Sequence, residues 1–185
     1  MERAIVLVGG IGKGVKLLTG GKPKTLLRIA GKTIIEYIID GLISCGVKEV
    51  ILVTDQPRFF EDVTVKYGRL IETRIVKQVG NDVYGAILSA KEEFSKPSLL
   101  VYGDTLVPNG AYRTVINTYM MYGKPVIMVV PEEDIRLYGA VRIGLGNKVE
   151  DFIEKPHMDI EGAYAYGGIA IIDKDFIEVL ESSTA

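Results

Sequence analysis

Short apolar runs and longer amphipathic segments follow one another along this chain. Residues 4–8 (AIVLV) form a continuous apolar run closed by glycines, which is typical of a strand buried on both faces of a sheet. The segment 33–45 has a different period, because its isoleucines and leucine recur on one helical face. Thr33 and Glu36 have capping-box spacing, and Gly46 can end the helix. The pattern therefore predicts a buried strand, then a loop, then a helix.

The same strand-first order recurs as far as Pro131. The further expected strands are 50–53, 70–77, 98–102 and 126–130, and the further expected helices are 58–67, 85–94 and 112–122. Such alternation predicts an α/β fold, a Rossmann-like three-layer sandwich with a mostly parallel sheet, helices on both faces and right-handed crossovers. Ligands in such sheets bind beyond the carboxyl ends of the strands, where the loops after Val8 and Tyr102 should lie.

The last third of the chain has a different pattern. Segments 138–143 and 148–153 flank the turn-rich sequence Gly144-Leu145-Gly146-Asn147, which predicts a β-hairpin, and 163–172 predicts another strand. The chain contains no repeat, low-complexity tract or linker-like change in composition. We therefore expect residues 1–185 to form a single domain, in which the hairpin is an addition to the α/β sheet.

Composition narrows the classes of protein that fit. Of the 185 residues 48% are hydrophobic and 25% are charged, which is near the average for globular proteins and argues against disordered or fibrous classes. The net charge of −2 argues against a general nucleic-acid binder, so a phosphate site has to come from a local cluster of lysines. The acidic run Glu132-Glu133-Asp134 is expected to be a solvated loop.

Cysteine content and hydropathy favour a soluble cytoplasmic protein without a membrane partner. Cys45 is the one cysteine, so it cannot form an internal disulfide, and with only His157 to help it cannot build a zinc site. The apolar run near the N-terminus is too short for a signal peptide, and no run approaches the ~20 residues that cross a bilayer. The apolar segment 119–122 fits a homo-oligomer interface as well as a core.

The first strand leads into a glycine-rich loop, GGIGKGVKLLTGGKPK, over residues 9–24. Glycines let backbone N–H groups approach a phosphate closely, and Lys24 can reach the same phosphates. The loop is not a dinucleotide fingerprint, because Val15 stands where a third glycine is needed, and it is not a Walker A loop, because Val15-Lys16 replaces Lys-Ser or Lys-Thr. A plain glycine-rich connection with solvent-facing lysines is the alternative interpretation of the loop taken alone.

Short motifs elsewhere follow this loop in a recognisable order. They are Gly9-Gly10-Ile11-Gly12, Leu18-Thr19, Pro23-Lys24, Gly31-Lys32, Gln78, Gly85 to Ala90, Tyr102-Gly103-Asp104, Tyr138 to Val141, Val149 to Phe152, Glu154-Lys155-Pro156 and Gly167-Gly168-Ile169. Together they resemble the sugar-phosphate nucleotidylyltransferases over nearly the whole chain. The resemblance implies substrates of two kinds, a nucleoside triphosphate and a sugar 1-phosphate, with pyrophosphate as the leaving product. It also implies a nucleotide-binding half at about 1–131 and a sugar-phosphate-binding half at about 132–185.

The resemblance implies a role for each motif as well. Lys24 and Asp104 are the expected catalytic residues, and Asp104 is also the expected ligand of a Mg²⁺ cofactor. The expected nucleotide-binding residues are Val8, Gly9, Gly10, Gly12, Lys13, Lys16, Gln78 and Gly103. The expected sugar-phosphate-binding residues are Gly139, Glu154, Lys155 and Gly168.

The chain departs from the family pattern around the expected catalytic site. Gly14 replaces an arginine that grips the triphosphate, for which a nearby lysine would be a partial substitute. Asp82-Val83-Tyr84 replaces Gly-Thr-Ala near the expected nucleobase, which leaves the base preference open. The chain stops soon after residues 175–180, whereas family members continue to a second metal-binding aspartate. Either a C-terminal piece is absent from this sequence or one metal carboxylate suffices.

These departures leave more than one function open. The first hypothesis is an active, Mg²⁺-dependent sugar-phosphate nucleotidylyltransferase. The second is a catalytically weakened relative that binds a nucleotide or sugar phosphate as a regulatory subunit. The third is an unrelated Rossmann-type oxidoreductase, for which Asp55 lies close to the end of the strand 50–53, although the first loop fails the required fingerprint.

Overall fold

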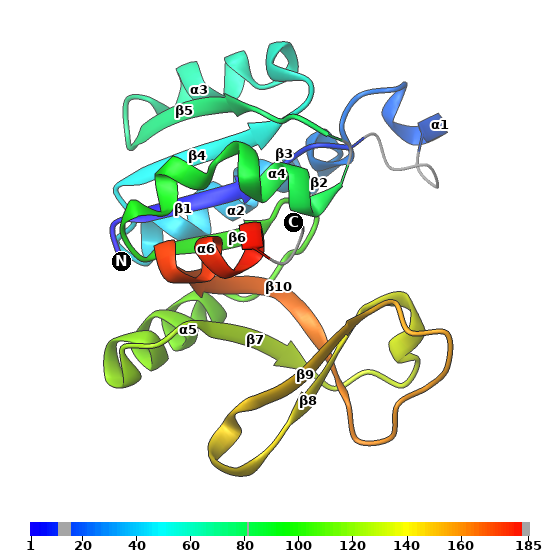
Figure 1. Ribbon diagram of the computed structural model, residues 1–185. Coiled ribbons are helices and arrows are strands. Elements are labelled where there is room, and N and C mark those ends of the chain that lie inside the picture. The colour runs from blue at the N-terminus through cyan, green and yellow to red at the C-terminus, as the bar shows by residue number, and fades with distance from the viewer. Residues whose placement is uncertain (11–15, 81, 183–185) are drawn as a thin grey trace.

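A central sheet with helices on both faces organises the chain (Figure 1). The computed structural model describes residues 1–10, 16–80 and 82–182. Strand β1 (Arg3–Leu7) lies in the middle, and β4 (Glu49–Thr54) and β6 (Ser98–Tyr102) pair with it in parallel. Strand β5 (Glu72–Lys77) extends the parallel part of the sheet beyond β4. The mostly parallel sheet that the strand-first pattern predicts is thus confirmed.

Strand β10 (Tyr164–Ile172) joins this parallel part to the C-terminal hairpin. It runs antiparallel between β6 and β7 (Val126–Val130), so β7 points the same way as β6 without pairing with it. At its other end β10 pairs with β8 (Gly139–Ile143), which forms the predicted hairpin with β9 (Val149–Glu154). A shift in the register of β10 against β7 lies between Tyr166 and Ala170.

Two apolar cores lie on opposite faces of the sheet. Ala4, Val6 and Val8 of the first strand face α2 (Ile34–Ser44), α3 (Glu61–Tyr67) and α5 (Asn109–Tyr122). Ile5 faces the other way, toward α4 (Val83–Ser89) and α6 (Lys174–Ser182). This division follows from the period of two in a strand, because successive side chains point to opposite faces. A continuous apolar run such as 4–8 is therefore required where both faces are covered.

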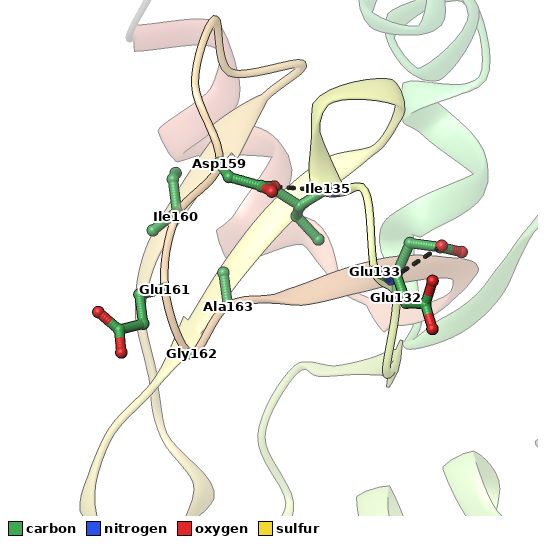
Figure 2. A pocket seen from close by; sticks show the side chains of 8 residues that line it. All are labelled: Glu132, Glu133, Ile135, Asp159, Ile160, Glu161, Gly162 and Ala163. Atoms are coloured by element: carbon green, nitrogen blue, oxygen red, sulfur yellow. Dashed lines mark hydrogen bonds between the residues drawn. The ribbon is translucent and has the colours of Figure 1, made fainter.

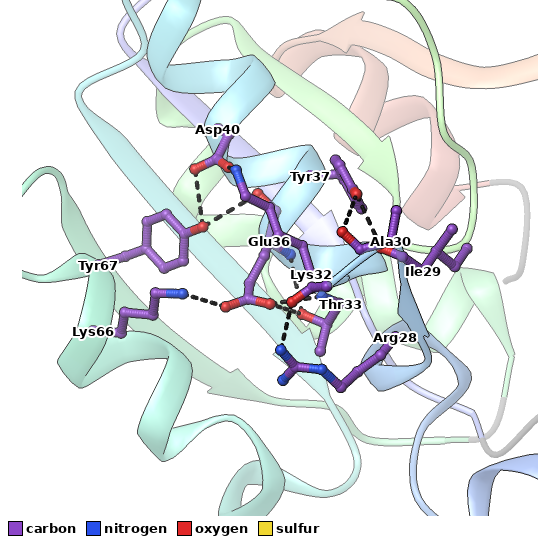
Figure 3. Close-up of polar contacts among 11 residues, drawn as sticks. Arg28, Ile29, Ala30, Lys32, Thr33, Glu36, Tyr37, Asp40, Lys66 and Tyr67 are labelled. Atoms are coloured by element: carbon purple, nitrogen blue, oxygen red, sulfur yellow. Dashed lines mark hydrogen bonds and ion pairs between the residues drawn. The ribbon is translucent and has the colours of Figure 1, made fainter.

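A polar cluster fastens helix α2 to helix α3 (Figure 3). The predicted capping box is present: the Thr33 N–H donates to Glu36 Oε2 at 2.6 Å, and the Glu36 N–H donates to the Thr33 hydroxyl at 3.3 Å. The Lys66 ammonium on α3 donates to the same glutamate, and the Tyr67 hydroxyl donates to Asp40 at 2.9 Å. Burial raises the pKa of Glu36, but the hydrogen bonds from Lys66 and Thr33 outweigh it and lower the pKa to about 2.

The boundaries of several helices differ from the sequence expectation. The expected helix 58–67 divides at Phe60 into a 3-10 turn and α3, and 85–94 divides at Ala90 into α4 and a second 3-10 turn. Helix α4 begins earlier than expected because the Asp82 carboxylate caps it by accepting from the Gly85 N–H. Helix α6 was not expected. The remaining short elements are α1 (Lys16–Thr19), η2 (Lys24–Leu26), β2 (Arg28–Ile29), β3 (Lys32–Thr33), η3 (Pro57–Phe59), η4 (Lys91–Ser95), η5 (Ile135–Leu137) and η6 (Leu145–Asn147).

The apolar segment at the end of α5 lies partly on the surface. Tyr119 packs against the core, whereas Met120, Met121 and Tyr122 are exposed. The segment therefore contributes one side chain to the core and three to the surface, and a homo-oligomer interface there stays a prediction. Within the described residues, no helix combines the length and the apolar character that crossing a bilayer requires.

Candidate active site

Four loops meet at one edge of the sheet, where the parallel strands end. Gly9 follows β1, Asp55 follows β4, Gln78 follows β5, and Gly103 with Asp104 follows β6. The carboxyl ends of parallel strands lie at the same edge, and this edge is the usual ligand site of α/β sheets. We call the edge of the sheet where these residues lie the strand-end edge. The expected nucleotide-binding residues Val8, Gly9, Gly10, Gln78 and Gly103 all lie there.

Gly9 lies in close contact with the loops after β4 and β5. A Cβ atom on Gly9 would lie 2.5 Å from Gln78 Oε1 and 3.3 Å from Asp55 Oδ1, so a side chain has little room. The Gly10 N–H donates to Asp55 Oδ1 at 3.4 Å, and its φ of +89° is one that favours glycine. The two glycines thus let the start of the first loop lie directly against its neighbours.

Gly103 makes the corresponding close contact between β6 and β1. Its N–H donates to the Leu7 carbonyl at 2.9 Å, and a Cβ atom on Gly103 would lie only 2.6 Å from that oxygen. The methyl group of Thr25 would lie 3.0 Å from the same Cβ position. Thr25 is buried, and its hydroxyl has no hydrogen-bond partner among the described residues. Tight packing of Gly103 on these neighbours fixes the backbone that precedes Asp104.

Lys24 and Asp104 contact each other although 80 residues separate them in the sequence. Lys24 lies on η2 and its ammonium donates to the Asp104 carboxylate, directly after β6. The two side chains are 35% and 37% exposed, so a ligand can reach both. The fold therefore brings together the two residues that the family resemblance implies to be catalytic.

The expected sugar-phosphate residues lie on the hairpin and on β10. Gly139 pairs with Glu154 across the hairpin, and a Cβ atom on Gly139 would lie 3.2 Å from Glu154 Oε2. The Lys155 N–H donates to the Tyr138 carbonyl at 3.0 Å, and the Lys155 ammonium lies 3.9 Å from Glu154 Oε1. In the described part of the chain, the ion-pair partner of Lys155 is thus Glu154 rather than Asp104.

Aromatic rings connect the hairpin with the strand-end edge. Tyr166 on β10 packs edge-on against Tyr102 at a centroid distance of 5.3 Å and against Phe152 at 5.9 Å. Burial, followed by the negative charges of Glu154 and Asp104, raises the pKa of Tyr102 to about 12. The carboxylates from both halves of the molecule therefore act on one tyrosine hydroxyl.

Gly168 forms a second connection between the two halves. Its φ is +73°, and a Cβ atom there would lie 2.8 Å from the Thr105 hydroxyl, in the loop that carries Asp104. At Gly168, β10 thus lies directly against the loop that holds the expected catalytic carboxylate. Gly12 and Lys13 lie outside the described residues, as does Gly14. Lys16 begins α1, and its side chain also lies outside the described part.

Asp104 offers one carboxylate toward a metal ion. Among the described residues, no group of three or more His, Cys, Asp or Glu side chains could hold a metal ion. Mg²⁺ prefers oxygen ligands and commonly keeps water while it is held by one or two carboxylates and by substrate phosphates. The donor set at Asp104 therefore fits a Mg²⁺ ion that a triphosphate helps to bind, and it does not fit an ion held by the protein alone.

An acidic cavity of about 380 Å³ lies near the hairpin (Figure 2), and neither Lys24 nor Asp104 lines it. It is lined by Glu132, Glu133, Ile135, Asp159, Ile160, Glu161, Gly162 and Ala163. Glu132 and Glu133 are exposed, as expected for a solvated loop, and the Ile135 N–H donates to Asp159 at 3.3 Å. Four carboxylates without a lysine or arginine in the lining would repel a phosphate, so this cavity does not fit either expected substrate.

Comparisons with known proteins found similarities over nearly the whole chain. The family model described as nucleotidyl transferase matches residues 3–184. A protein of Methanocaldococcus jannaschii that carries the provisional name UTP–glucose-1-phosphate uridylyltransferase is 26% identical, over 89% of this chain and 71% of its own length. A glucose-1-phosphate thymidylyltransferase of Actinoplanes sp. is 24% identical, over 97% of this chain and 61% of its own length. The chain thus spans less than two thirds of the second relative.

Solved structures confirm the fold. A UDP-glucose pyrophosphorylase complexed with UDP-glucose superimposes with a TM-score of 0.84, over 98% of this chain and 79% of that chain. The sequence identity is 20%, so the likeness establishes the arrangement of strands and helices. Near the site, the sequence motifs did not indicate Tyr166, and they indicated Asp55 only for the oxidoreductase alternative. The position of Asp55 after a buried apolar strand was a usable signal, because such positions lie at the strand-end edge.

Proposed function

Because the chain belongs to the nucleotidyl transferase family, we propose that it transfers a nucleotidyl group from a nucleoside triphosphate to a sugar 1-phosphate. The observation that carries this proposal is the contact between Lys24 and Asp104 at the strand-end edge. The Lys24 ammonium and the Asp104 carboxylate come from distant parts of the chain and meet near the glycine-rich loop. A triphosphate needs a cation at such a site, and its metal ion needs a carboxylate.

The reaction requires the protein to handle developing negative charge. An oxygen of the sugar 1-phosphate forms a bond to the α-phosphorus, and the bond from that phosphorus to the bridging oxygen of pyrophosphate breaks. Lys24 would neutralise charge on the α-phosphate and on the departing pyrophosphate. A Mg²⁺ ion held by Asp104 and the phosphates would supply further charge neutralisation. Lys24 then has to exchange the Asp104 carboxylate for a phosphate when the triphosphate binds.

The two halves of the molecule would bind the two substrates separately. Backbone N–H groups of the first loop would hold the phosphates, and Gln78 would lie beside the base. On the hairpin, Glu154 would accept hydrogen bonds from sugar hydroxyls, while Lys155 would contact the sugar phosphate. The N–H of Gly139 would donate to a further sugar oxygen, and Gly168 would let β10 pass close to the sugar. Attraction of both phosphates to lysines would offset the repulsion between the two anionic substrates.

A screen for pyrophosphate release tests this proposal. Each common triphosphate is combined with each common sugar 1-phosphate, with and without Mg²⁺. We expect release from at least one pair, dependent on Mg²⁺, and a loss of about 10²–10³ in kcat in both Lys24→Ala and Asp104→Ala. Lys22→Ala is the matched control, because Lys22 is an exposed lysine two residues away. Triphosphate binding without turnover in every combination would favour the regulatory-subunit alternative instead.

A further inference from the structure

Two hydrogen-bond acceptors converge on the first glycine of the loop. The Gln78 side-chain oxygen and the Asp55 carboxylate lie 2.5 Å and 3.3 Å from the position that a Gly9 Cβ atom would take. Gln78 is half-buried and Asp55 is exposed, so the pair lies at the border between the protein and the ligand side. These contacts come from the ends of β4 and β5, which hold both side chains against the start of the loop.

The orientation of the Gln78 amide is fixed by its neighbours. Its Nε2 group donates to the Gly80 carbonyl at 3.3 Å and to the Asp82 carbonyl at 3.1 Å. Rotation of the amide by half a turn would place Oε1 against those two carbonyl oxygens, which cannot donate. Both amide hydrogens are therefore used inside the protein, and Gln78 offers only its oxygen to a ligand.

Three backbone donors near this acceptor pair have partners within the protein. The Val79 N–H donates to the Ser89 hydroxyl at 2.8 Å, and the Gly85 N–H donates to the Asp82 carboxylate at 2.7 Å. The Gly10 N–H donates to Asp55 itself at 3.4 Å. Beside these paired donors lie two acceptors, Gln78 Oε1 and the Asp55 carboxylate. A base that contacts both acceptors has to bring its own N–H groups.

We infer that this acceptor pair selects guanine, with Asp55 reading the 2-amino group and Gln78 reading the adjacent ring N–H. This inference rests on the proposed function, because it concerns the base of the triphosphate. Guanine carries two neighbouring donors, N1–H and the 2-amino group. Adenine and cytosine place a ring nitrogen acceptor beside their amino group, and uracil and thymine place carbonyl oxygens on both sides of one N–H. With each of those bases, one of the two protein acceptors, Gln78 Oε1 or the Asp55 carboxylate, would face another acceptor and lose its partner.

Inosine triphosphate provides a test of this assignment, because it differs from GTP only in lacking the 2-amino group. Dissociation constants are measured calorimetrically for the whole chain with Mg²⁺ and GTP, ITP, ATP, CTP, UTP or dTTP, without a sugar phosphate. We expect GTP to bind about tenfold to hundredfold more tightly than ITP, and more tightly than the other four. In Asp55→Asn the ratio of the GTP and ITP constants should fall to about 1, while ITP binding stays unchanged.

The variant Asp55→Asn keeps an oxygen that can accept from Gly10, so loss of the loop contact is not its main effect. Asp62→Asn, an exposed aspartate on α3, is the control and should keep the GTP preference. Equal binding of GTP and ITP, tightest binding of another base, or an equal loss of GTP and ITP binding in Asp55→Asn would each overturn the inference. In those cases pyrophosphate release with another triphosphate would leave the proposed function standing, whereas no release with any triphosphate would overturn both.

Discussion

The strand-end edge and the hairpin differ in how firmly the fold holds their functional residues. At the edge, Gly9 and Gly103 pack against neighbouring strands, and the core lies directly beneath them. On the hairpin, the side chains of Glu154 and Lys155 are 65% and 67% exposed, and the supporting core is a small cluster of Ile135, Ala140 and Ala165. The comparison indicates that the proposed nucleotide site is preorganised and the proposed sugar site is open, and that β10 joins them.

The largest expected loss of stability comes from adding a methyl group where β6 contacts β1. Gly103→Ala places a methyl group 2.6 Å from the Leu7 backbone oxygen, so the strands have to separate. We expect a loss of about 2–4 kcal/mol in the free energy of unfolding, measured by urea denaturation. Gly110→Ala on α5 is the matched control, because a Cβ atom there meets nothing within 4 Å. It should be neutral or stabilising by up to about 1 kcal/mol, and equal losses in both variants would contradict the account.

Acid should destabilise the α2–α3 contact through Glu36. Its pKa of about 2 in the folded protein lies below the ordinary 4.5, so the ionised form stabilises the fold above pH 4.5 and this contribution disappears as the pH falls to 2. The contribution at neutral pH is about 3 kcal/mol. Unfolding free energies of the natural chain and of Glu36→Gln should therefore differ at pH 6 and converge near pH 2. A difference that stays constant over this range would contradict the assignment.

In the turn directly before the hairpin, the ion pair between Asp134 and Arg136 should contribute much less to stability. A hydrogen bond from Arg136 lowers the pKa of Asp134 to about 2, as Lys66 and Thr33 do for Glu36. Asp134 and Arg136 are half-exposed, and solvent screens such pairs strongly. We expect Asp134→Asn to leave the acid denaturation curve close to that of the natural chain. A shift as large as that of Glu36→Gln would remove the distinction between the two regions.

The kinetic constants KM and kcat should also distinguish the hairpin from the strand-end edge. Lys155→Ala should raise the KM for the sugar 1-phosphate by about tenfold while kcat changes little, because an exposed lysine contributes mainly to binding. Its melting temperature should equal that of the natural chain. Lys148→Ala, an exposed lysine directly before β9 in the same hairpin, is the control. A fall in kcat with an unchanged KM would place Lys155 among the groups that act in the transition state.

The smallest expected effect is at Thr25. Thr25→Val keeps the shape and removes a buried hydroxyl that lacks a partner among the described residues. We expect the free energy of unfolding to rise by about 1 kcal/mol. A clear loss of stability would mean that the hydroxyl has a partner, such as a buried water molecule.

The sequence alone predicted the order of elements well where local patterns were strong. The capping box at Thr33 and Glu36, the buried strands and the hairpin all follow from side-chain period and turn residues. It did not predict that β10 would insert between β6 and β7, because pairing between distant strands leaves no local signal. Nor did it predict helix α6 or the division of the helix near Ala90.

The sequence predicted several individual residues of the candidate site, but it predicted few of the contacts between them. Lys24 and Asp104 were expected from their motifs, and the fold brings them into contact. The approach of Asp55 to Gly9 depends on three-dimensional packing, since 45 residues lie between them in the sequence and no motif includes both. The packing of Tyr166 between Tyr102 and Phe152 is likewise a consequence of β10 crossing from one region to the other.

The central claim is that Lys24, held at the strand-end edge beside Asp104, acts on the transferring phosphoryl group. The most direct measurement is the single-turnover rate of pyrophosphate release at saturating substrates for Lys24→Ala and for Lys155→Ala. We expect the rate to be about 10²–10³ times lower than that of the natural chain for Lys24→Ala and nearly unchanged for Lys155→Ala. A Lys24→Ala variant that releases pyrophosphate at the natural rate would contradict it.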